Sequence, residues 1–217
     1  MGKGRLIIGT KRYSSWSLRG WLAVHLAGLE VEEVLIPLAG GATAAIKEVS
    51  PNGMVPFLEH DGARIWESLA IAEYCAEIAP LLWPADRPAR AHARAIASEM
   101  HAGFRALRMA MPMNLGRTFP GLGRTPEALA DIARIEAIWA EALAHHGGPF
   151  LFGARFTLAD AMYAPVVTRF LTWQPELSAT SHAYMTAVRA HPLMERWYAE
   201  AAAEPAAWLL NKYENPA

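Results

Sequence analysis

Tyr13-Ser14-Ser15-Trp16-Ser17-Leu18-Arg19 is a hydroxyl-rich stretch near the start of the 217-residue chain. An apolar run, Leu6-Ile7-Ile8, precedes it, and an amphipathic run from Trp21 to Gly28 follows it. This order predicts a β-strand, a tight turn and an α-helix. A strand–turn–helix unit of this kind is a typical beginning of an α/β fold.

The turn carries more hydroxyl groups than a helix start requires. One serine is enough to cap the following helix, whereas residues 14–17 contain three. Hydroxyls and free backbone N–H groups at a helix N-terminus point to one position beyond the helix, which suits an anion, a phosphate or a thiolate. The stretch therefore predicts either a simple cap or a site for a negatively charged group.

The segments around and after the turn complete a small sheet with covering helices. Expected strands lie at residues 5–10, 31–36, 55–60 and 63–66, and expected helices at 17–28, 42–49 and 68–78. The first two strands and the helix between them form a parallel βαβ unit. The Asp61-Gly62 turn joins the last two strands as a hairpin. The resulting order is βαβ, a helical connection, then ββα.

The remainder of the chain predicts helices and no strand. Expected helices lie at residues 90–111, 126–144, 158–173, 180–190 and 192–203, where apolar residues recur every three or four positions. We therefore predict an α/β domain at residues 1–79, a proline-rich linker at 80–89 and an all-helical domain at 90–217.

The composition indicates a globular protein and excludes several functional classes. With 53% hydrophobic and 19% charged residues, the chain can bury a substantial core. The net charge of −1 gives no electrostatic reason to bind nucleic acid or an anionic membrane. The single cysteine, Cys75, excludes an intramolecular disulfide and a zinc site made of cysteine pairs. We expect a cytoplasmic protein that holds no metal and spans no membrane.

Val55-Pro56 stands at the entry to a predicted strand. Proline cannot donate to a ladder in mid-strand, so it is expected at a strand start or an edge. A cis bond here would turn the backbone of Val55 outward, where it could pair with a peptide-like ligand. The alternative is an ordinary trans proline that opens an edge strand.

Glu67-Ser68 opens the helix after the hairpin. Ser68 is a natural N-cap. Glu67 beside it could bind an ammonium group while the helix N-terminus and the serine hydroxyl bind a carboxylate. Together they could hold the α-amino-acid end of a ligand.

Thr157-Leu158-Ala159-Asp160 has the form of a capping box, with aspartate in place of the usual glutamate or glutamine. We expect this motif to start a buried helix and to serve structure rather than chemistry.

The combination of these motifs resembles the glutathione S-transferase superfamily, in particular serine-type bacterial members near the zeta and theta classes. The resemblance rests on the serine turn, Ser50-Pro51-x-x-x-Val55-Pro56, Glu67-Ser68-Leu69-Ala70-Ile71 and Thr157-x-x-Asp160, and it covers almost the whole chain. The turn is similar to the Ser-Ser-Cys-Ser-x-Arg pattern of the zeta class, with Trp16 where that class has cysteine. The resemblance implies a thioredoxin-like domain followed by an all-helical domain.

The resemblance also implies a glutathione site and roles for its residues. Val55 and cis-Pro56 would pair with the cysteinyl backbone of glutathione, and Glu67 and Ser68 would take its γ-glutamyl end. Lys47 and Arg12 are candidates for its glycine carboxylate. Ser14 or Ser15 would donate a hydrogen bond to the sulfur, which favours the thiolate.

The thiolate is expected to attack a small hydrophobic electrophile in a pocket covered by the second domain. Trp16, His101, Arg108 and Met109 are the candidates to line that pocket. The resemblance also implies a homodimer, which exposed apolar positions on the helices at 68–78 and 90–111 would suit.

The sequence alone is compatible with three functions. The first is a glutathione transferase. The second keeps the same thiolate but isomerises a substrate of the maleylacetoacetate type or acts as a peroxidase. The third is a non-catalytic binding or regulatory protein on the same scaffold.

Overall fold

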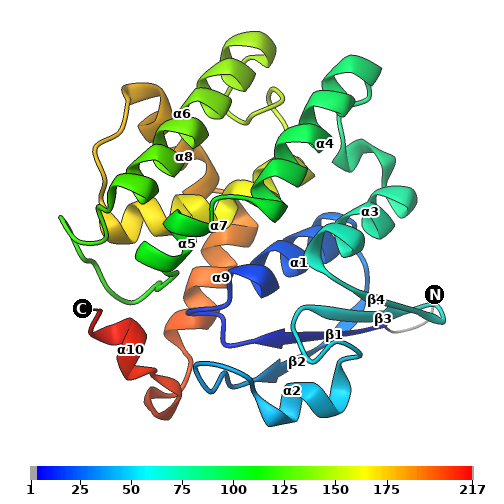
Figure 1. Cartoon of the computed structure of the whole chain (residues 1–217). Helices are drawn as coiled ribbons and strands as arrows, with labels where there is room; N and C mark the ends of the chain where they lie inside the picture. The colour runs from blue at the N-terminus through cyan, green and yellow to red at the C-terminus, as the bar shows by residue number, and fades with distance from the viewer. Residues whose placement is uncertain (1–3, 217) are drawn as a thin grey trace.

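A computed structural model describes residues 4–216, and its first half is built on a four-stranded mixed sheet (Figure 1). The strands are β1 (Gly4–Gly9), β2 (Val31–Ile36), β3 (Phe57–His60) and β4 (Ala63–Trp66). Their order is β2-β1-β3-β4, with β1 parallel to β2 and the other pairs antiparallel. The predicted βαβ unit and hairpin are both confirmed.

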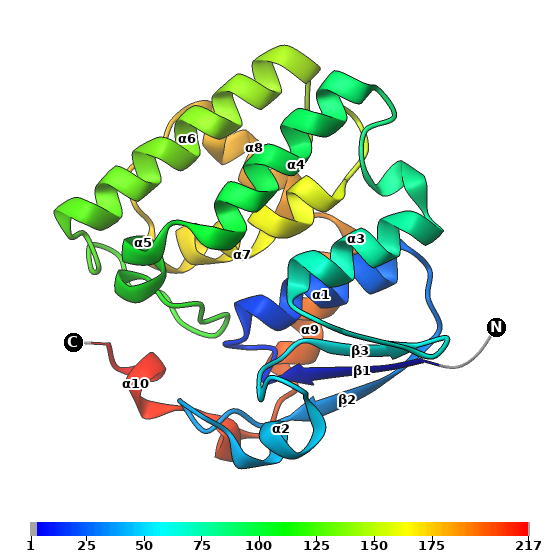
Figure 2. The ribbon, with the colours of Figure 1, turned by 45° about the vertical axis from the view of Figure 1, so that its right-hand side comes forward.

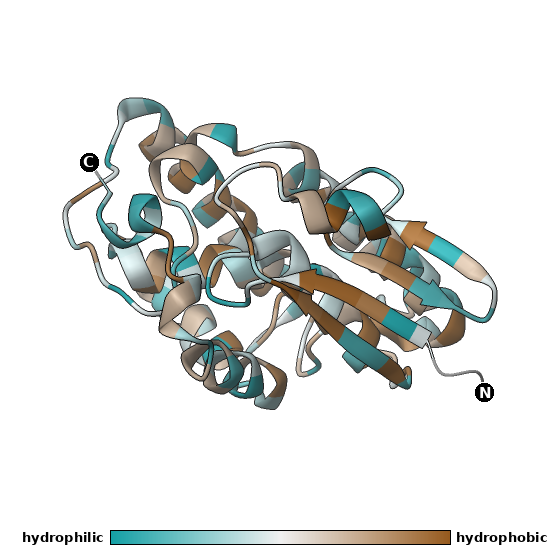
Figure 3. Cartoon of the chain, turned by 90° about the horizontal axis from the view of Figure 1, so that it is seen from below, coloured by the Kyte–Doolittle hydropathy of each residue, from teal (hydrophilic) through white to brown (hydrophobic). Residues whose placement is uncertain are grey.

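Helices cover both faces of this sheet. Figures 1 and 2 place α1 (Ser15–Leu26) and α3 (Ser68–Ile78) on the face toward the helical half, and α2 (Ala44–Val49) on the other. Seen from below, the central strands are largely hydrophobic (Figure 3). Leu6, Ile8 and Leu58 of the sheet are fully buried. The sheet is thus sandwiched between helices, as parallel pairing requires.

Gly20 brings α1 close to the turn before β3. A Cβ added at Gly20 would lie 2.7 Å from Cγ of Pro56, closer than real side chains approach. Glycine therefore lets the helix that starts at the serine turn pack directly on Pro56, and two motifs far apart in sequence become neighbours.

The second half contains helices and short 3₁₀ turns but no strand among the described residues. Its elements are η1 (Pro80–Leu82), α4 (Arg87–Ala102), α5 (Arg105–Ala110), α6 (Pro126–His146), α7 (Leu158–Trp173), α8 (Ala179–Arg189), α9 (Pro192–Ala202), η2 (Ala206–Trp208) and α10 (Asn211–Glu214). All of α7 except Leu171 is buried, as expected for a helix that is apolar on every side. The predicted all-helical second half is confirmed.

The single helix predicted at 90–111 is wrong. The chain breaks between α4 and α5, where Phe104 adopts a left-handed backbone with φ of 58°. Gly103 permits the break because a Cβ there would lie 2.8 Å from the carbonyl oxygen of Glu99. The side chain of Phe104 is 8% exposed, so burial of its ring accompanies the turn that redirects α5.

The capping box at the start of α7 is confirmed. The Asp160 carboxylate accepts hydrogen bonds from the Thr157 amide and hydroxyl, both at 2.8 Å. It also accepts from the Leu151 amide at 3.0 Å and the Tyr184 hydroxyl at 3.2 Å. Asp160 is fully buried, so this carboxylate joins α7, α8 and the loop before them.

Lys11 connects the two halves of the chain. Its ammonium is almost fully buried, lies 2.7 Å from Glu33 of β2 and forms a short ion pair with Glu200 of α9. Glu33 is also contacted by His25 and Trp21. Burial opposes ionisation of Glu33, but these hydrogen bonds outweigh it and hold its pKa well below the ordinary value of 4.5.

Replacing Glu33 by glutamine is expected to lower the free energy of unfolding at pH 7 by about 2 kcal/mol, a usual loss when a hydrogen-bonded charge is removed. Because the folded-state pKa is lowered, the Glu33 contribution is present above pH 4.5 and is lost as the pH falls below that value. Urea unfolding at pH 7 and pH 3 would measure both effects. The exposed neighbour Glu32 provides the control, as Glu32→Gln. An equal response of the two variants would contradict the prediction.

The C-terminal segment from Leu210 to Glu214, which contains α10, packs against the serine turn and was not predicted. The Tyr13 hydroxyl donates to Glu214 at 2.6 Å and accepts from the Leu210 amide at 3.3 Å. Asn114 donates to the Tyr213 carbonyl at 2.8 Å. The end of the described chain therefore returns to its beginning. None of the helices in residues 4–216 has the length and apolar character needed to cross a bilayer.

Candidate functional site

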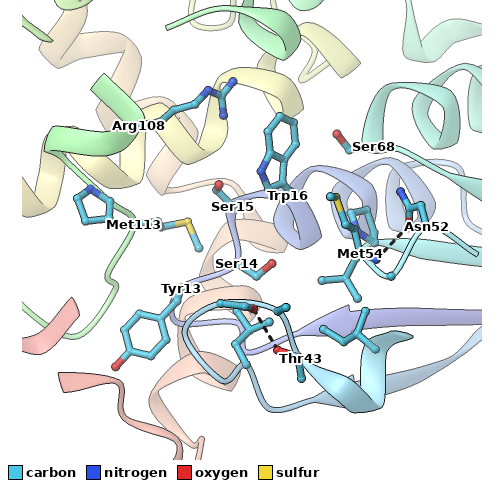
Figure 4. A pocket seen from close by; sticks show the side chains of 18 of the residues that line it. Tyr13, Ser14, Ser15, Trp16, Thr43, Asn52, Met54, Ser68, Arg108 and Met113 are labelled. Atoms are coloured by element: carbon cyan, nitrogen blue, oxygen red, sulfur yellow. Dashed lines mark hydrogen bonds between the residues drawn. The ribbon is translucent and has the colours of Figure 1, made fainter. Parts of the chain in front are cut away.

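A cleft of about 690 Å³ lies where the serine turn meets the helical half (Figure 4). It is lined by residues 13–16, 52–56 and 67–68 of the first half and by Arg108, Pro112, Met113, Arg169 and Tyr213 of the second. The serine turn, the proline motif and the Glu-Ser motif thus meet at one cavity. This convergence is what the sequence motifs predicted.

Ser14 is the N-cap of α1, and its hydroxyl is engaged within the protein. Its oxygen accepts from the Ser17 amide at 3.3 Å, and the hydroxyl donates to Ser17 Oγ at 2.7 Å. Ser17 Oγ in turn accepts from the Gly9 amide at 2.9 Å. Ser14 and Ser17 therefore account for the capping role of the turn.

Ser15 has a different environment from Ser14. Its oxygen accepts a hydrogen bond from Arg169 Nη2 at 3.2 Å, and the described residues offer no acceptor for its hydrogen. Figure 4 shows the Ser15 hydroxyl directed toward Arg108 and away from Ser14. Ser15 is therefore free to donate into the cleft.

Tyr13 adds a fourth hydroxyl to those of the three serines at the turn. Burial, its bond to Glu214 and the charge of that carboxylate raise the pKa of Tyr13 to about 12. Because its proton is held by Glu214, Tyr13 is a wall of the cleft rather than a donor or an acid.

The opposite end of the cleft carries the two other motifs. The Val55–Pro56 peptide bond is cis, one of the two alternatives left open by the sequence. Glu67, with φ of 71°, occupies the N-cap position of α3 without making a side-chain cap. Ser68 is therefore not the N-cap. Ser68 is 1% exposed and its hydroxyl has no hydrogen-bond partner in the described structure, which is unusual for a buried polar group.

Lys47 and Arg12, the two residues predicted to bind a terminal carboxylate of the ligand, differ in position. Lys47 of α2 lines the cleft near Gly53. Arg12 does not line it, because its guanidinium packs against Gly116.

Trp16 is the centre of the wall toward the helical half. The guanidinium carbons of Arg19 and Arg108 lie 4.9 and 4.7 Å from its ring centroid, and the His101 ring meets it edge-on at 5.3 Å. Trp16 and Arg108 line the cleft, whereas His101 stands behind it, against Trp16 and 3.7 Å from the carboxylate of Glu67. Figure 4 shows Arg108 above Trp16 and Ser15.

Met109 does not belong to this wall, contrary to the prediction. Its side chain is 73% exposed. Successive residues of a helix are about 100° apart, so the turn of α5 that directs Arg108 toward Trp16 directs Met109 to solvent.

Arg169 and Tyr213 line the cleft but were not predicted. Arg169 is 4% exposed on the buried helix α7. Burial and the neighbouring charge of Arg108 lower its pKa to about 9. A lone arginine within an apolar helix was a usable sequence signal. Tyr213 carried none, because its place depends on how α10 folds back.

No group of three or more histidine, cysteine, aspartate or glutamate side chains in residues 4–216 is arranged to hold a metal ion. The polar groups that line the cleft include the hydroxyls of Ser14, Ser15 and Ser68 and the guanidinium groups of Arg108 and Arg169.

Comparisons with known proteins agree with this geometry. Residues 13–78 match the family model of the glutathione S-transferase N-terminal domain, and residues 122–200 match that of the C-terminal domain. The chain is 32% identical over 184 residues to maleylacetoacetate isomerase of Rhizobium meliloti (strain 1021), a match that covers 76% of this chain and 82% of that protein. It is 31% identical over 159 residues to a probable maleylacetoacetate isomerase of Caenorhabditis elegans, which covers 70% and 72%.

A solved structure gives the same result. Maleylacetoacetate isomerase from Anaeromyxobacter dehalogenans 2CP-1, crystallised with glutathione in its active site, superposes with a TM-score of 0.68 at 27% identity, covering 94% of this chain and 98% of that one. With both domain models matched in order and the relatives covered over most of their length, this chain belongs to the glutathione S-transferase family.

Proposed function

We propose that the chain binds glutathione in this cleft and transfers it, as a thiolate held by Ser15, to a small electrophile. Glu67 and Ser68 bind the γ-glutamyl end, and Val55 beside Pro56 pairs with the cysteinyl backbone. Lys47, which lines the same cleft, binds the glycine carboxylate. The observation that supports this most is the buried, unpartnered hydroxyl of Ser68, which lines the same cleft as the free hydroxyl of Ser15.

The chemistry follows from the surroundings of the sulfur. A free thiol has a pKa of about 8.5, so it is mostly protonated at neutral pH. A hydroxyl donor, the N-terminus of α1 and the positive charge of Arg169 all favour the thiolate. Because Ser15 already accepts from Arg169, its single hydrogen is available for the sulfur. Ser15 acts as an electrostatic stabiliser, while the sulfur is the nucleophile.

Isomerisation is a second candidate function of the same site, and the relatives named maleylacetoacetate isomerase support it. In that reaction the thiolate adds to a conjugated double bond, the bond rotates, and elimination regenerates glutathione. Measuring free glutathione during the reaction distinguishes the two functions, because conjugation consumes glutathione whereas isomerisation does not.

We also propose a homodimer and a cytoplasmic location. Trp66 of β4, Ile78 of α3 and Leu81 of η1 are apolar and between 44% and 58% exposed, as expected of a surface that another copy covers. Cys75 is a free, buried thiol, which fits a reducing compartment.

Replacing Ser68 by alanine tests the proposed glutathione site. We expect glutathione affinity to fall about tenfold, the usual loss for one hydrogen bond to a charged group, with little change in stability because the hydroxyl makes no bond within the protein. Isothermal titration with glutathione and urea unfolding would measure the two quantities.

Ser178→Ala is the matched control. Ser178 caps α8 by accepting from the Ser181 amide, so its loss should cost about 1 kcal/mol of stability and leave glutathione affinity unchanged. If Ser68→Ala bound glutathione as tightly as the unaltered protein, the assignment of this end of the cleft would be wrong.

A further inference from the structure

Three arginines gather beside Trp16 at the helical side of the cleft. Arg19 and Arg169 are 1% and 4% exposed, and Arg108 is half-buried. Burial, and after it the charge of the neighbouring Arg108, lowers the pKa of both Arg19 and Arg169. Within residues 4–216, none of the three forms an ion pair with a carboxylate. Asp131 acts on Arg108 only from a longer distance.

The guanidinium groups are partly satisfied by backbone carbonyls. Arg19 donates to Met162, Arg108 to Gly103 and Met100, and Arg169 to Pro165. Buried N–H groups remain without a partner on each of them, namely Nη1 and Nη2 of Arg19, Nη1 of Arg108 and Nε of Arg169. Buried charges are normally paired, because an uncompensated one is costly. The cluster can therefore bind an anion, and the described part of the chain does not supply one.

Trp16 holds the cluster in place. Two of the guanidinium groups lie over its ring, an arrangement that favours both partners. The subsite is thus built on a residue that replaces the cysteine of the zeta pattern, and a cysteine could not support the arginines in this way. Arg19 belongs to the pattern that the serine turn resembles, whereas Trp16, which supports Arg19 and Arg108, departs from it.

We propose that this cluster is a carboxylate-binding subsite, in which Arg108 and Arg169 bind an acid group of the second substrate, so that the electrophile is an organic anion. The inference rests on the proposed function, because it places the acid group next to the sulfur of bound glutathione. It adds an acid group to the small hydrophobic electrophile expected from the sequence.

A carboxylate fits better than a larger anion. The planar fork of a guanidinium matches two carboxylate oxygens. Pro112 and Met113 line the cleft alongside Arg108 and give apolar contact to the carbon chain of such an acid. The thiolate of glutathione neutralises at most one of the three charges, which leaves positive charge for a second anionic group.

A matched pair of glutathione conjugates tests the subsite without turnover. S-(2-carboxyethyl)glutathione and S-propylglutathione have side arms of the same length, and only the first ends in a carboxylate. We expect the unaltered protein to bind the carboxyethyl conjugate at least about tenfold more tightly, as for other charge-assisted hydrogen bonds. Isothermal titration at pH 7 measures both. Equal affinities would overturn the subsite, whereas failure of both conjugates and of glutathione to bind would overturn the proposed function as well.

The variant Arg108→Gln tests whether Arg108 belongs to the carboxylate-binding subsite. We expect it to abolish the preference for the carboxyethyl conjugate while S-propylglutathione binds as before. Arg105→Gln, on the exposed side of the same short helix, makes the same charge change and should keep the preference. A preference that survived Arg108→Gln would remove Arg108 from the subsite. The comparison of the two conjugates in the unaltered protein decides the main proposal even if Arg108→Gln fails to fold.

Discussion

Replacing Ser15 by alanine is expected to raise the pKa of the bound glutathione thiol by about one to two units and to lower kcat/KM at pH 7 about 10- to 100-fold. A hydrogen bond to a charged group contributes about 1.5–3 kcal/mol, and one pKa unit corresponds to about 1.4 kcal/mol. The thiolate would lose its only hydroxyl donor, while Arg169 would keep its charge but lose the group through which it acts. Titration of thiolate absorbance in the glutathione complex measures the pKa directly.

Ser14→Ala is the control for this prediction. It removes the cap of α1, so it should cost about 1 kcal/mol of stability and leave the thiol pKa nearly unchanged, because the Ser14 hydroxyl is donated to Ser17. If instead Ser14→Ala raised the thiol pKa and Ser15→Ala did not, Ser14 would be the activating residue and the Ser15–Arg169 pair would be structural.

Replacing Asp160 by alanine is expected to lower the free energy of unfolding by at least about 3 kcal/mol, the range in which a broken buried network falls. Four donors would lose their acceptor, among them two backbone N–H groups. Burial raises the pKa of Asp160, whereas the four hydrogen bonds lower it. The ionised carboxylate therefore depends on all four bonds. Urea unfolding at pH 7 measures the loss.

Asp86 offers a matched control for Asp160. It also stands at a helix N-terminus, where it accepts one bond from the Ala89 amide at 2.9 Å, but it is exposed. Asp86→Ala should therefore cost only about 1 kcal/mol. A loss in Asp160→Ala no larger than that in Asp86→Ala would mean that α7 is positioned by its apolar packing alone.

The fold was predictable because its signals are local. The apolar run Leu6-Ile7-Ile8 before the serine turn and the Asp61-Gly62 hairpin define the sheet within short windows. The break at Phe104 was not predictable, since a bulky residue rarely adopts a left-handed backbone and the apolar spacing continues across it. Phe104 does so where its ring can be buried, which is a tertiary property.

The site was predictable in its parts but not in its roles. The sequence put both Ser14 and Ser15 forward, with Ser14 first, because both stand at the start of the same helix. What distinguishes them is a contact between Ser15 and Arg169, 154 positions apart. Ser68 illustrates the same limit, because serine at the start of a helix usually caps it, and only the backbone at Glu67 shows that Ser68 does not.

The return of the C-terminal segment to the serine turn bears on how this protein can diverge. Tyr13 is held by Glu214 and Leu210, Ser15 by Arg169, and the amides of Lys11 and Arg12 by Glu204. A hybrid gene that joined this sheet domain to the helical half of another relative would lose these partners at once. Recombination between such genes is therefore expected to keep the two halves together, and new substrate preferences to arise by point substitutions at Trp16 and the arginines around it.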